Sequence, residues 1–468
     1  MEGIGNGKAA QGGRDAALAN RRILLLAMED KKRGARSPEW ERIMDLQSRL
    51  LRLSWLLPAA LTLGAAAAAS AQEDHAHMTM PAPAAASPAV GQSRWSDPKS
   101  WPDRKVPREG DAVTIGKGQD VVLDVSPPAL RSLTIKGKLS FSNAKDLALT
   151  TEWIYLPGGE LDIGSEAHPH TRKATITLTD NVKDENVNTM GDRGIMLLGG
   201  TLSLHGDRKN SWTKLSATAK ADATRIDVVN AAGWRKGDVI VLASTDYNPR
   251  QAEERTITAI SGNALTLDKP LAYMHFGEVS FGVDERGEVG LLTRNIKIQA
   301  SEDAEKTYFG GHIMAMAGSR MYVSGVELNR MGQNMHLARY PIHWHILGEG
   351  AGQYIEDSSI HDTYNRCVTV HGTNDLLVEN NVTYNTVGHC FFLEDGIEHG
   401  NQFIRNLAIQ TKCHPTLDCV PMNLAANGER DPKYSDRRAY SELSFHGGHT
   451  PAALGQHGGL ILDHQSRQ

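Results

Sequence analysis

A histidine–glutamate pair and a cysteine pair share one spacing in the second half of the chain. Cys367 and Cys390 lie 23 residues apart, and so do His371 and Glu394 (390 − 367 and 394 − 371). The preceding repeat has a small insertion and places His345 at the equivalent position. A period near 23 residues with short alternating strands is typical of a solenoid, in which residues one period apart stack about 4.8 Å from each other. We therefore expect His345, His371 and Glu394 to form a column on one strand face.

Such a column supports three kinds of chemistry. Two imidazoles and a carboxylate can hold a divalent metal such as Zn²⁺ or Mn²⁺, which makes His345, His371 and Glu394 a candidate metal site. The same groups can hydrolyse a glycosidic bond by acid/base catalysis, or abstract a proton beside a uronate carboxylate before elimination. Polar ladders also stabilise solenoids without catalysing anything, and the sequence leaves that interpretation open. The predicted catalytic residues are His343, His345, His371, Glu394 and Asp395.

Residues next to the column are candidates for holding a substrate. Strand alternation directs Ile342 and Trp344 to the core and His343 and His345 outward, onto a face that suits a long polysaccharide. Two arginines there can bind an acidic sugar through paired hydrogen bonds. The predicted substrate-binding set is Arg339, Tyr340, Trp344 and Arg366.

Upstream segments must build the scaffold for this face. From residue 95 to 212 a Gly-x-Leu-x-apolar pattern recurs, beginning at Gly137, Gly159 and Gly200, as in short strands behind turn glycines. We expect this part to be an irregular beginning of the same solenoid. Residues 213–272 break the pattern and predict a small inserted β module, after which the solenoid resumes over residues 273–412.

Several motifs agree, in order, with one known family. The first group resembles the G8 domain and consists of Trp101, Pro107, Gly110-Asp111, Leu133-x-Ile135-x-Gly137-x-Leu139, Gly158-Gly159-x-Leu161 and Ile163-Gly164-x-Glu166. The second resembles the parallel β-helix that follows that domain and consists of Gly310-Gly311-His312, Gly325-Val326-Glu327-Leu328, Arg339-Tyr340-Pro341-Ile342-His343-Trp344-His345 and Asn365-Arg366-Cys367-Val368-Thr369-Val370-His371-Gly372. The family includes the cell-migration-inducing hyaluronan-binding proteins, transmembrane protein 2 and fibrocystin.

The resemblance covers roughly residues 95–411 and has consequences for fold and function. It implies an all-β fold: a right-handed parallel β-helix with an N-terminal G8 domain and the inserted β module. The hyaluronan-degrading members imply a polysaccharide substrate, whereas fibrocystin-like members are not known as enzymes. No set of catalytic residues is carried over from the family.

Both ends of the chain carry features of another kind. Residues 44–71 read as a signal peptide, because basic residues and an apolar run precede a small-x-small site at Ala69-Ser70-Ala71. We interpret residues 1–43 as an extension upstream of the true start and residues 72–94 as an Ala/Pro-rich linker. Residues 413–468 form an irregular tail, which we interpret as frameshifted after about residue 446.

Composition and the export signal narrow the class of partner. A net charge of −5 gives no general reason to expect nucleic acid, and 45 Gly with 8 Phe suit a turn-rich β protein. We expect a secreted or periplasmic monomer with no stable membrane span after signal cleavage. Its expected partner is a hyaluronan-like acidic polysaccharide, which it binds and cleaves as a glycosidase or a lyase. A non-catalytic glycan- or protein-binding surface module and an inactive truncated product are the alternatives.

Overall fold

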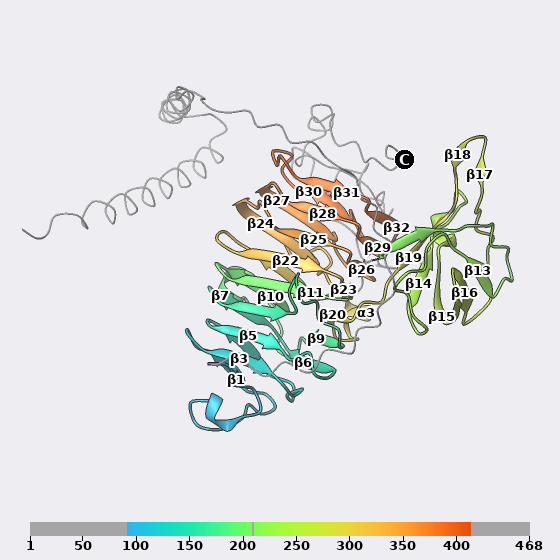
Figure 1. The fold of residues 1–468 in the computed structure, drawn as a ribbon. Coiled ribbons are helices and arrows are strands. Elements are labelled where there is room, and N and C mark those ends of the chain that lie inside the picture. The colour runs from blue at the N-terminus through green and yellow to red at the C-terminus, as the bar shows by residue number, and fades with distance from the viewer. Residues whose placement is uncertain (1–90, 208–209, 413–468) are drawn as a thin grey trace, which may run out of the picture. The chain divides into compact units, whose positions relative to one another are not determined.

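Three long parallel sheets run through the part of the chain that the computed structural model describes, residues 91–207 and 210–412 (Figure 1). The predicted signal peptide, the N-terminal extension and the tail lie outside the described residues, as does nearly all of the linker. Within those ranges no helix has the length and hydrophobicity needed to cross a bilayer. The helical segments are η1 (Pro98–Ser100), η2 (Val187–Thr189), η3 (Pro249–Gln251) and α3 (Ala304–Thr307).

From residue 147 onward the chain visits the three sheets in turn, so each coil adds one strand to each sheet, whereas the earlier strands alternate between two of them. The nine-stranded sheet contains β1 (Ser93–Arg94), β3 (Asp120–Leu123), β5 (Lys138–Phe141), β8 (Glu160–Ile163), β11 (Thr201–His205), β22 (Arg320–Ser324), β25 (Tyr354–Glu356), β28 (Leu377–Glu379) and β31 (Gln402–Ile404). The eight-stranded sheet contains β2 (Ala112–Ile115), β4 (Ser132–Ile135), β7 (Ile154–Pro157), β10 (Gly194–Leu198), β21 (His312–Ala315), β24 (Ile342–Glu349), β27 (Val368–Asn374) and β30 (Phe391–Leu393). The seven-stranded sheet contains β6 (Leu147–Thr151), β9 (Ala174–Leu178), β20 (Ile296–Ala300), β23 (Val326–Asn329), β26 (Ser359–His361), β29 (Val382–Val387) and β32 (Leu407–Lys412). This arrangement confirms the predicted parallel β-helix.

The early strands belong to the same solenoid as the later ones. In the nine-stranded sheet β8 pairs with β5 on one side and with β11 on the other, which continues directly to β22. The glycine that opens each early repeat lies where coils meet closely. A Cβ on Gly159 would lie 2.1 Å from the carbonyl oxygen of Ile135, so only glycine fits there.

One strand face fills the interior of the coils, as the alternation predicts. Ile342, Trp344, Val368 and Val370 all lie in the main hydrophobic core and are fully buried. Burying each such side chain contributes about 1.5–3 kcal/mol, and the stacked register repeats this gain from coil to coil. The opposite face of β24 and β27 therefore carries the polar residues of interest.

Stacked polar side chains and sulfurs hold successive coils at their corners and in the core. The Asn381 amide donates to the Asn406 side chain (3.0 Å), and Asn381 Oδ1 accepts from the Ser358 backbone (3.1 Å). Cys367 and Cys390 occupy equivalent positions on successive coils, and their sulfur atoms lie 2.8 Å apart in the core. These contacts join neighbouring coils and so stabilise the solenoid.

An antiparallel module interrupts the solenoid and extends further than expected. Its six-stranded sheet contains β12 (Trp212–Lys214), β13 (Arg225–Asp227), β14 (Val239–Leu242), β15 (Glu253–Ser261), β16 (Ala264–Leu267) and β19 (Glu288–Leu291). A hairpin adds β17 (Val279–Ser280) and β18 (Val283–Asp284). The predicted boundary at residue 272 is therefore too early, because β19 returns to pair with both β12 and β14.

The module packs on the seven-stranded sheet, and charges are interspersed over the surface. Val241 and Leu292 form one apolar cluster with Val382, Tyr384 and Leu407 of the solenoid.

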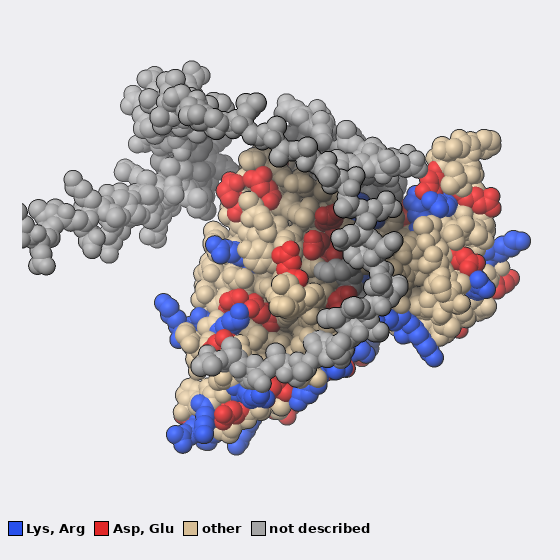
Figure 2. Space-filling view, viewed as in Figure 1, with Lys and Arg blue, Asp and Glu red and all other residues tan. Residues whose placement is uncertain are grey.

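Figure 2 shows acidic and basic side chains as small separate patches over the visible face.

Candidate functional site

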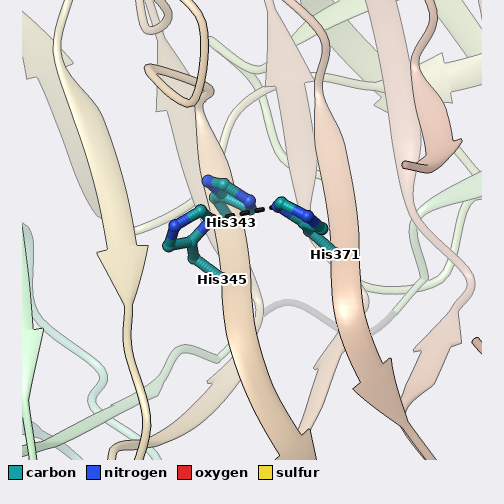
Figure 3. A group of neighbouring side chains, drawn as sticks. All are labelled: His343, His345 and His371. Atoms are coloured by element: carbon teal, nitrogen blue, oxygen red, sulfur yellow. Dashed lines mark hydrogen bonds between the residues drawn. The ribbon is translucent and has the colours of Figure 1, made fainter. Parts of the chain in front are cut away.

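His345 and His371 meet on neighbouring strands of the eight-stranded sheet, as the repeat predicts. They are paired in register between β24 and β27, and their Nδ1 atoms are 3.1 Å apart (Figure 3). Directly after this pair the register shifts before Gly348, and Ile346 has a φ of 50°. This irregularity contributes one residue of the small insertion, because the offset between paired residues falls here from 26 (371 − 345) to 25 (373 − 348) and reaches 23 only at Tyr354 and Leu377. Such irregularities re-aim side chains beside functional sites.

Glu394 and Asp395 complete the cluster from the end of β30. Glu394 Oε2 is 3.5 Å from His371 Nδ1 and 3.9 Å from His343 Nε2. Asp395 Oδ2 is 3.0 Å from His371 Nε2. The five residues predicted as catalytic are therefore brought together. His371 lies between the two carboxylates.

Burial divides the cluster into a closed inner part and an open outer part. The side chains of His343 and Glu394 are 0% and 4% exposed, whereas that of Asp395 is 42% exposed. His343 points outward as expected but is covered by the segment before β24. The carbonyl oxygen of Ala338 accepts from its Nδ1 (3.3 Å), and the ring of Tyr340 packs against it.

The inner histidines are poor bases. Burial lowers the pKa of His343 well below its usual value, and the neighbouring His345 and His371 lower it further. Burial and the neighbouring His371 lower the pKa of His345 to about 4. Both rings are therefore neutral at physiological pH, which is the form that can bind a metal.

Tyr340 and Arg366 support Glu394 and do not reach outward. Arg366 Nη1 donates to the Tyr340 hydroxyl (2.6 Å), which donates to Glu394 Oε1 (3.2 Å). The Arg366 guanidinium lies 4.3 Å from the centre of the Phe392 ring, and burial raises the pKa of Tyr340 to about 12. Tyr340 is 0% and Arg366 7% exposed. The structure thus corrects their predicted role, because buried side chains that hold a carboxylate cannot bind an outside sugar.

The two other predicted substrate contacts differ from each other. Trp344 lies in the core, where its indole donates to Gln353 Oε1 (3.1 Å), so its predicted role as a substrate contact is wrong. Arg339 is half-buried and donates to the Thr189 carbonyl (3.4 Å). No carboxylate of the described residues forms a salt bridge with Arg339. Of the four predicted substrate-binding residues, Arg339 is therefore the one that can bind an acidic ligand.

The predicted site residues include neither Glu398 nor His312. Glu398 accepts from the backbone amides of Gly372 (2.9 Å) and Asp395 (3.1 Å), and so fixes the turn that presents Asp395. His312, of the Gly310-Gly311-His312 motif, is fully buried, and burial lowers its pKa to about 3. It lies in β21, where Met314 and not His312 pairs in register with His343, so the repeat gives no signal for it. Glu398 follows the last matched repeat and has no signal either.

Two family models match the chain over separate segments. Residues 100–216 match the G8 domain, and residues 308–443 match the CEMIP beta-helix. Mouse Fibrocystin-L is 38% identical over 365 residues, which cover 67% of this chain and 9% of that protein. The human protein named Cell surface hyaluronidase CEMIP2 is 40% identical over 238 residues, covering 46% of this chain and 17% of that protein. The chain thus spans a small part of the length of these relatives.

A solved structure with a weaker likeness is the Gp54 tailspike of Acinetobacter baumannii bacteriophage AP22 in complex with A. baumannii capsular saccharide. It is 12% identical, with 59% of this chain and 53% of that chain covered and a TM-score of 0.17. The family matches confirm the resemblance read from the motifs: the chain belongs to the G8-domain proteins whose G8 domain is followed by a CEMIP-type β-helix.

Proposed function

We propose that the chain binds an acidic extracellular polysaccharide on the outer face of the eight-stranded sheet and cleaves it at the histidine–carboxylate cluster. The observation that carries this proposal is the pairing of exposed Asp395 with His371, at 3.0 Å, while the other nitrogen of the same ring lies 3.5 Å from buried Glu394. A carboxylate–imidazole pair at the edge of a closed cluster can exchange a proton with a bound ligand while its geometry stays fixed.

The sheet surface beside the cluster suits an extended chain. Tyr155, Met196, Met314 and His343 lie in register on successive strands of this sheet. Tyr155 is half-exposed and, with Trp153, belongs to the apolar cluster around these methionines. Met196, Met314 and His343 are buried, so the half-exposed rings of Tyr155 and Trp153 are the part of this surface that can offer sugar rings an apolar platform.

Arg339 would give the site a preference for acidic sugars. Its half-buried guanidinium lies near enough to His345 to lower the pKa of that ring, after burial and His371. A planar guanidinium binds a carboxylate through two parallel hydrogen bonds, so a uronate on Arg339 would be held beside the cluster. The hyaluronidase name of the CEMIP2 relative supports the same class of substrate, and the predicted signal peptide supports export.

Two reactions are open to this geometry. In hydrolysis, the acid protonates the glycosidic oxygen, the bond to the sugar carbon breaks, and water supplies the new hydroxyl. In elimination, the base removes the proton beside the uronate carboxylate, the glycosidic oxygen leaves with its electron pair, and a double bond remains. Asp395, oriented by His371, is the group that exchanges the proton in both cases.

The test is a depolymerisation assay of the full chain on hyaluronan, chondroitin and other uronate polysaccharides. Chain length, new reducing ends and the ultraviolet absorbance of unsaturated products are followed, because only elimination produces the last. We expect Asp395→Asn to reduce the cleavage rate by about 10²-fold or more while the fold persists.

Asp375→Asn is the matched control, since Asp375 is another exposed aspartate on the same solenoid. It should cleave at the wild-type rate. Equal cleavage by wild type and Asp395→Asn would contradict the assigned role. Binding without any shortening would instead identify a non-catalytic glycan-binding module.

A further inference from the structure

The hydrogen bonds of His343 and His371 determine which of their nitrogens carry protons. A backbone carbonyl only accepts, so the contact of His343 Nδ1 with the Ala338 oxygen places the proton on Nδ1. The contact of His371 Nε2 with the Asp395 carboxylate likewise places a proton on Nε2. With one proton on each ring, His343 Nε2 and His371 Nδ1 are left as acceptors, and His371 Nδ1 has His345 Nδ1 as its neighbour at 3.1 Å.

These acceptors face another acceptor. Glu394 Oε2 lies 3.5 Å from His371 Nδ1 and 3.9 Å from His343 Nε2. Neither His343 Nε2 nor Glu394 Oε2 has a hydrogen-bond partner among the described residues, although both side chains are at least nine-tenths buried. Unpaired buried acceptors that converge on one point are costly unless a cation joins them.

We infer that His343 Nε2, His345 Nδ1 and His371 Nδ1 bind one divalent metal ion, with Glu394 Oε2 as the fourth ligand. The ligand atoms of the three histidines all lie within 4.8 Å of one another, as Figure 3 lets the reader follow. Zn²⁺ with bonds of about 2.0–2.1 Å in a tetrahedron needs ligand atoms about 3.3 Å apart. The distances are 3.1 Å between the Nδ1 atoms of His345 and His371, 3.5 Å from His371 Nδ1 to Glu394 Oε2, and 3.9 Å from Glu394 Oε2 to His343 Nε2. They lie on both sides of the required separation of about 3.3 Å.

The surroundings have the pattern of a metal site. A metal-bound histidine typically donates its second N–H to a carboxylate or a backbone carbonyl, and a metal-bound carboxylate is itself hydrogen-bonded. Here His371 pairs with Asp395, His343 with the Ala338 carbonyl, and Glu394 Oε1 with the Tyr340 hydroxyl. A neutral histidine set with one carboxylate favours zinc over calcium or magnesium, which prefer oxygen ligands.

The binding of metal at this site stands independently of the proposed function, whereas its catalytic meaning rests on that function. An ion bound to His371 Nδ1 leaves Asp395 as the group that exchanges the proton. With four protein ligands the tetrahedron is closed, so the ion would hold His371 and Glu394 in place beside Asp395 rather than bind water or substrate itself.

The test is titration of the chelator-treated full chain with Zn²⁺ alone, without glycan, followed by calorimetry and metal analysis. The wild type should bind one equivalent that His345→Asn/His371→Asn loses. His75→Asn/His77→Asn controls for the N-terminal histidines and should keep that equivalent. Asp395→Asn should weaken zinc affinity by about 10–100-fold, because it removes the partner of a ligand without removing the ligand.

Thermal unfolding without metal verifies that each variant is folded. If His345→Asn/His371→Asn is not folded, His345→Gln alone takes its place, because His345 is only half-buried. Zinc binding of equal stoichiometry and affinity in wild type and the folded cluster variant would overturn the inference, as would no zinc binding by the wild type. Zinc binding at the cluster without cleavage of any glycan would support the inference and refute the proposed function.

Discussion

On the seven-stranded sheet His361 lies beside Glu327 and Asp362, much as His371 lies beside Glu394 and Asp395 on the eight-stranded sheet. His361 uses both ring nitrogens, with Nδ1 2.8 Å from Asp362 and Nε2 3.3 Å from Glu327. Lys297 adds a second cation 2.7 Å from Glu327. This network pairs every charge with an opposite one.

Protonation differs between the two regions accordingly. Burial disfavours charge on His361, but the hydrogen bonds to Asp362 and Glu327 outweigh it and raise the pKa of His361 to about 9. In the cluster of the eight-stranded sheet, burial instead lowers the pKa of His343 and His345. The same residue types therefore form a closed ion network in one place and, in the other, a cluster in which His343 Nε2 and Glu394 Oε2 have no hydrogen-bond partner among the described residues. Only the second arrangement has capacity left for a ligand.

The largest expected effect comes from opening the closed network. Glu327→Gln leaves Lys297 and protonated His361 facing a neutral amide in a buried site. Removing one partner of a buried ion pair costs about 3–5 kcal/mol, and we expect a loss of that size in the free energy of unfolding, measured in urea. Glu349→Gln, an exposed glutamate of β24, is the control. A loss below about 1 kcal/mol would show that the network is not closed.

The pH dependence of stability should distinguish the network from a neutral site. Because the pKa of His361 is raised from 6.5 to about 9, its stabilisation is complete below pH 6.5 and is lost as pH rises through 9. The pKa values of Glu327 and Asp362 are lowered to about 2, so their contribution is lost only as pH falls toward that value. The stability advantage of wild type over His361→Gln should fall by on the order of 3 kcal/mol between pH 6.5 and 10. A difference that is independent of pH would refute a charged His361.

Zinc should stabilise the protein only through the open cluster. A ligand at 100 times its Kd raises the free energy of unfolding by about 2.7 kcal/mol. We expect this shift for wild type and for His361→Gln, and none for His345→Asn/His371→Asn. Thermal unfolding with and without Zn²⁺ measures it, and an equal shift in all three proteins would place the ion elsewhere.

The smallest effect is expected for the glutamate of the open cluster. In Glu394→Gln the amide oxygen can still accept from the Tyr340 hydroxyl, and the amide N–H₂ can donate to the unprotonated nitrogens of His343 and His371. We expect its free energy of unfolding without metal to stay within about 1 kcal/mol of wild type or to rise, in contrast to Glu327→Gln. A loss as large as that of Glu327→Gln would remove the distinction between the two regions.

The sequence repeat predicts which residues stack on one another in neighbouring coils. A spacing of 23 residues is sufficient to stack Cys367 on Cys390, and the same template with its insertion places His345 on His371, because in-register parallel strands repeat every residue's position. Strand alternation likewise assigns Trp344 to the core, against its predicted contact with substrate.

Residues brought in from outside the period could not be predicted in this way. The segment before β24 covers His343 and turns Tyr340 inward, and no spacing in the sequence indicates that it folds back over the sheet. The end of the inserted module depends on the antiparallel return of β19 to β12, a pairing between residues more than 70 positions apart (288 − 214). His312 and Glu398 matter only once these neighbours are in place.

The most direct test of the central claim compares one histidine from each region in the depolymerisation assay. His371→Ala should lower the rate of polysaccharide shortening by about 10²-fold or more while leaving the fold intact. His361→Gln, assayed at a temperature where it is folded, should cleave at the wild-type rate despite its lower stability. Undiminished cleavage by His371→Ala would contradict the account.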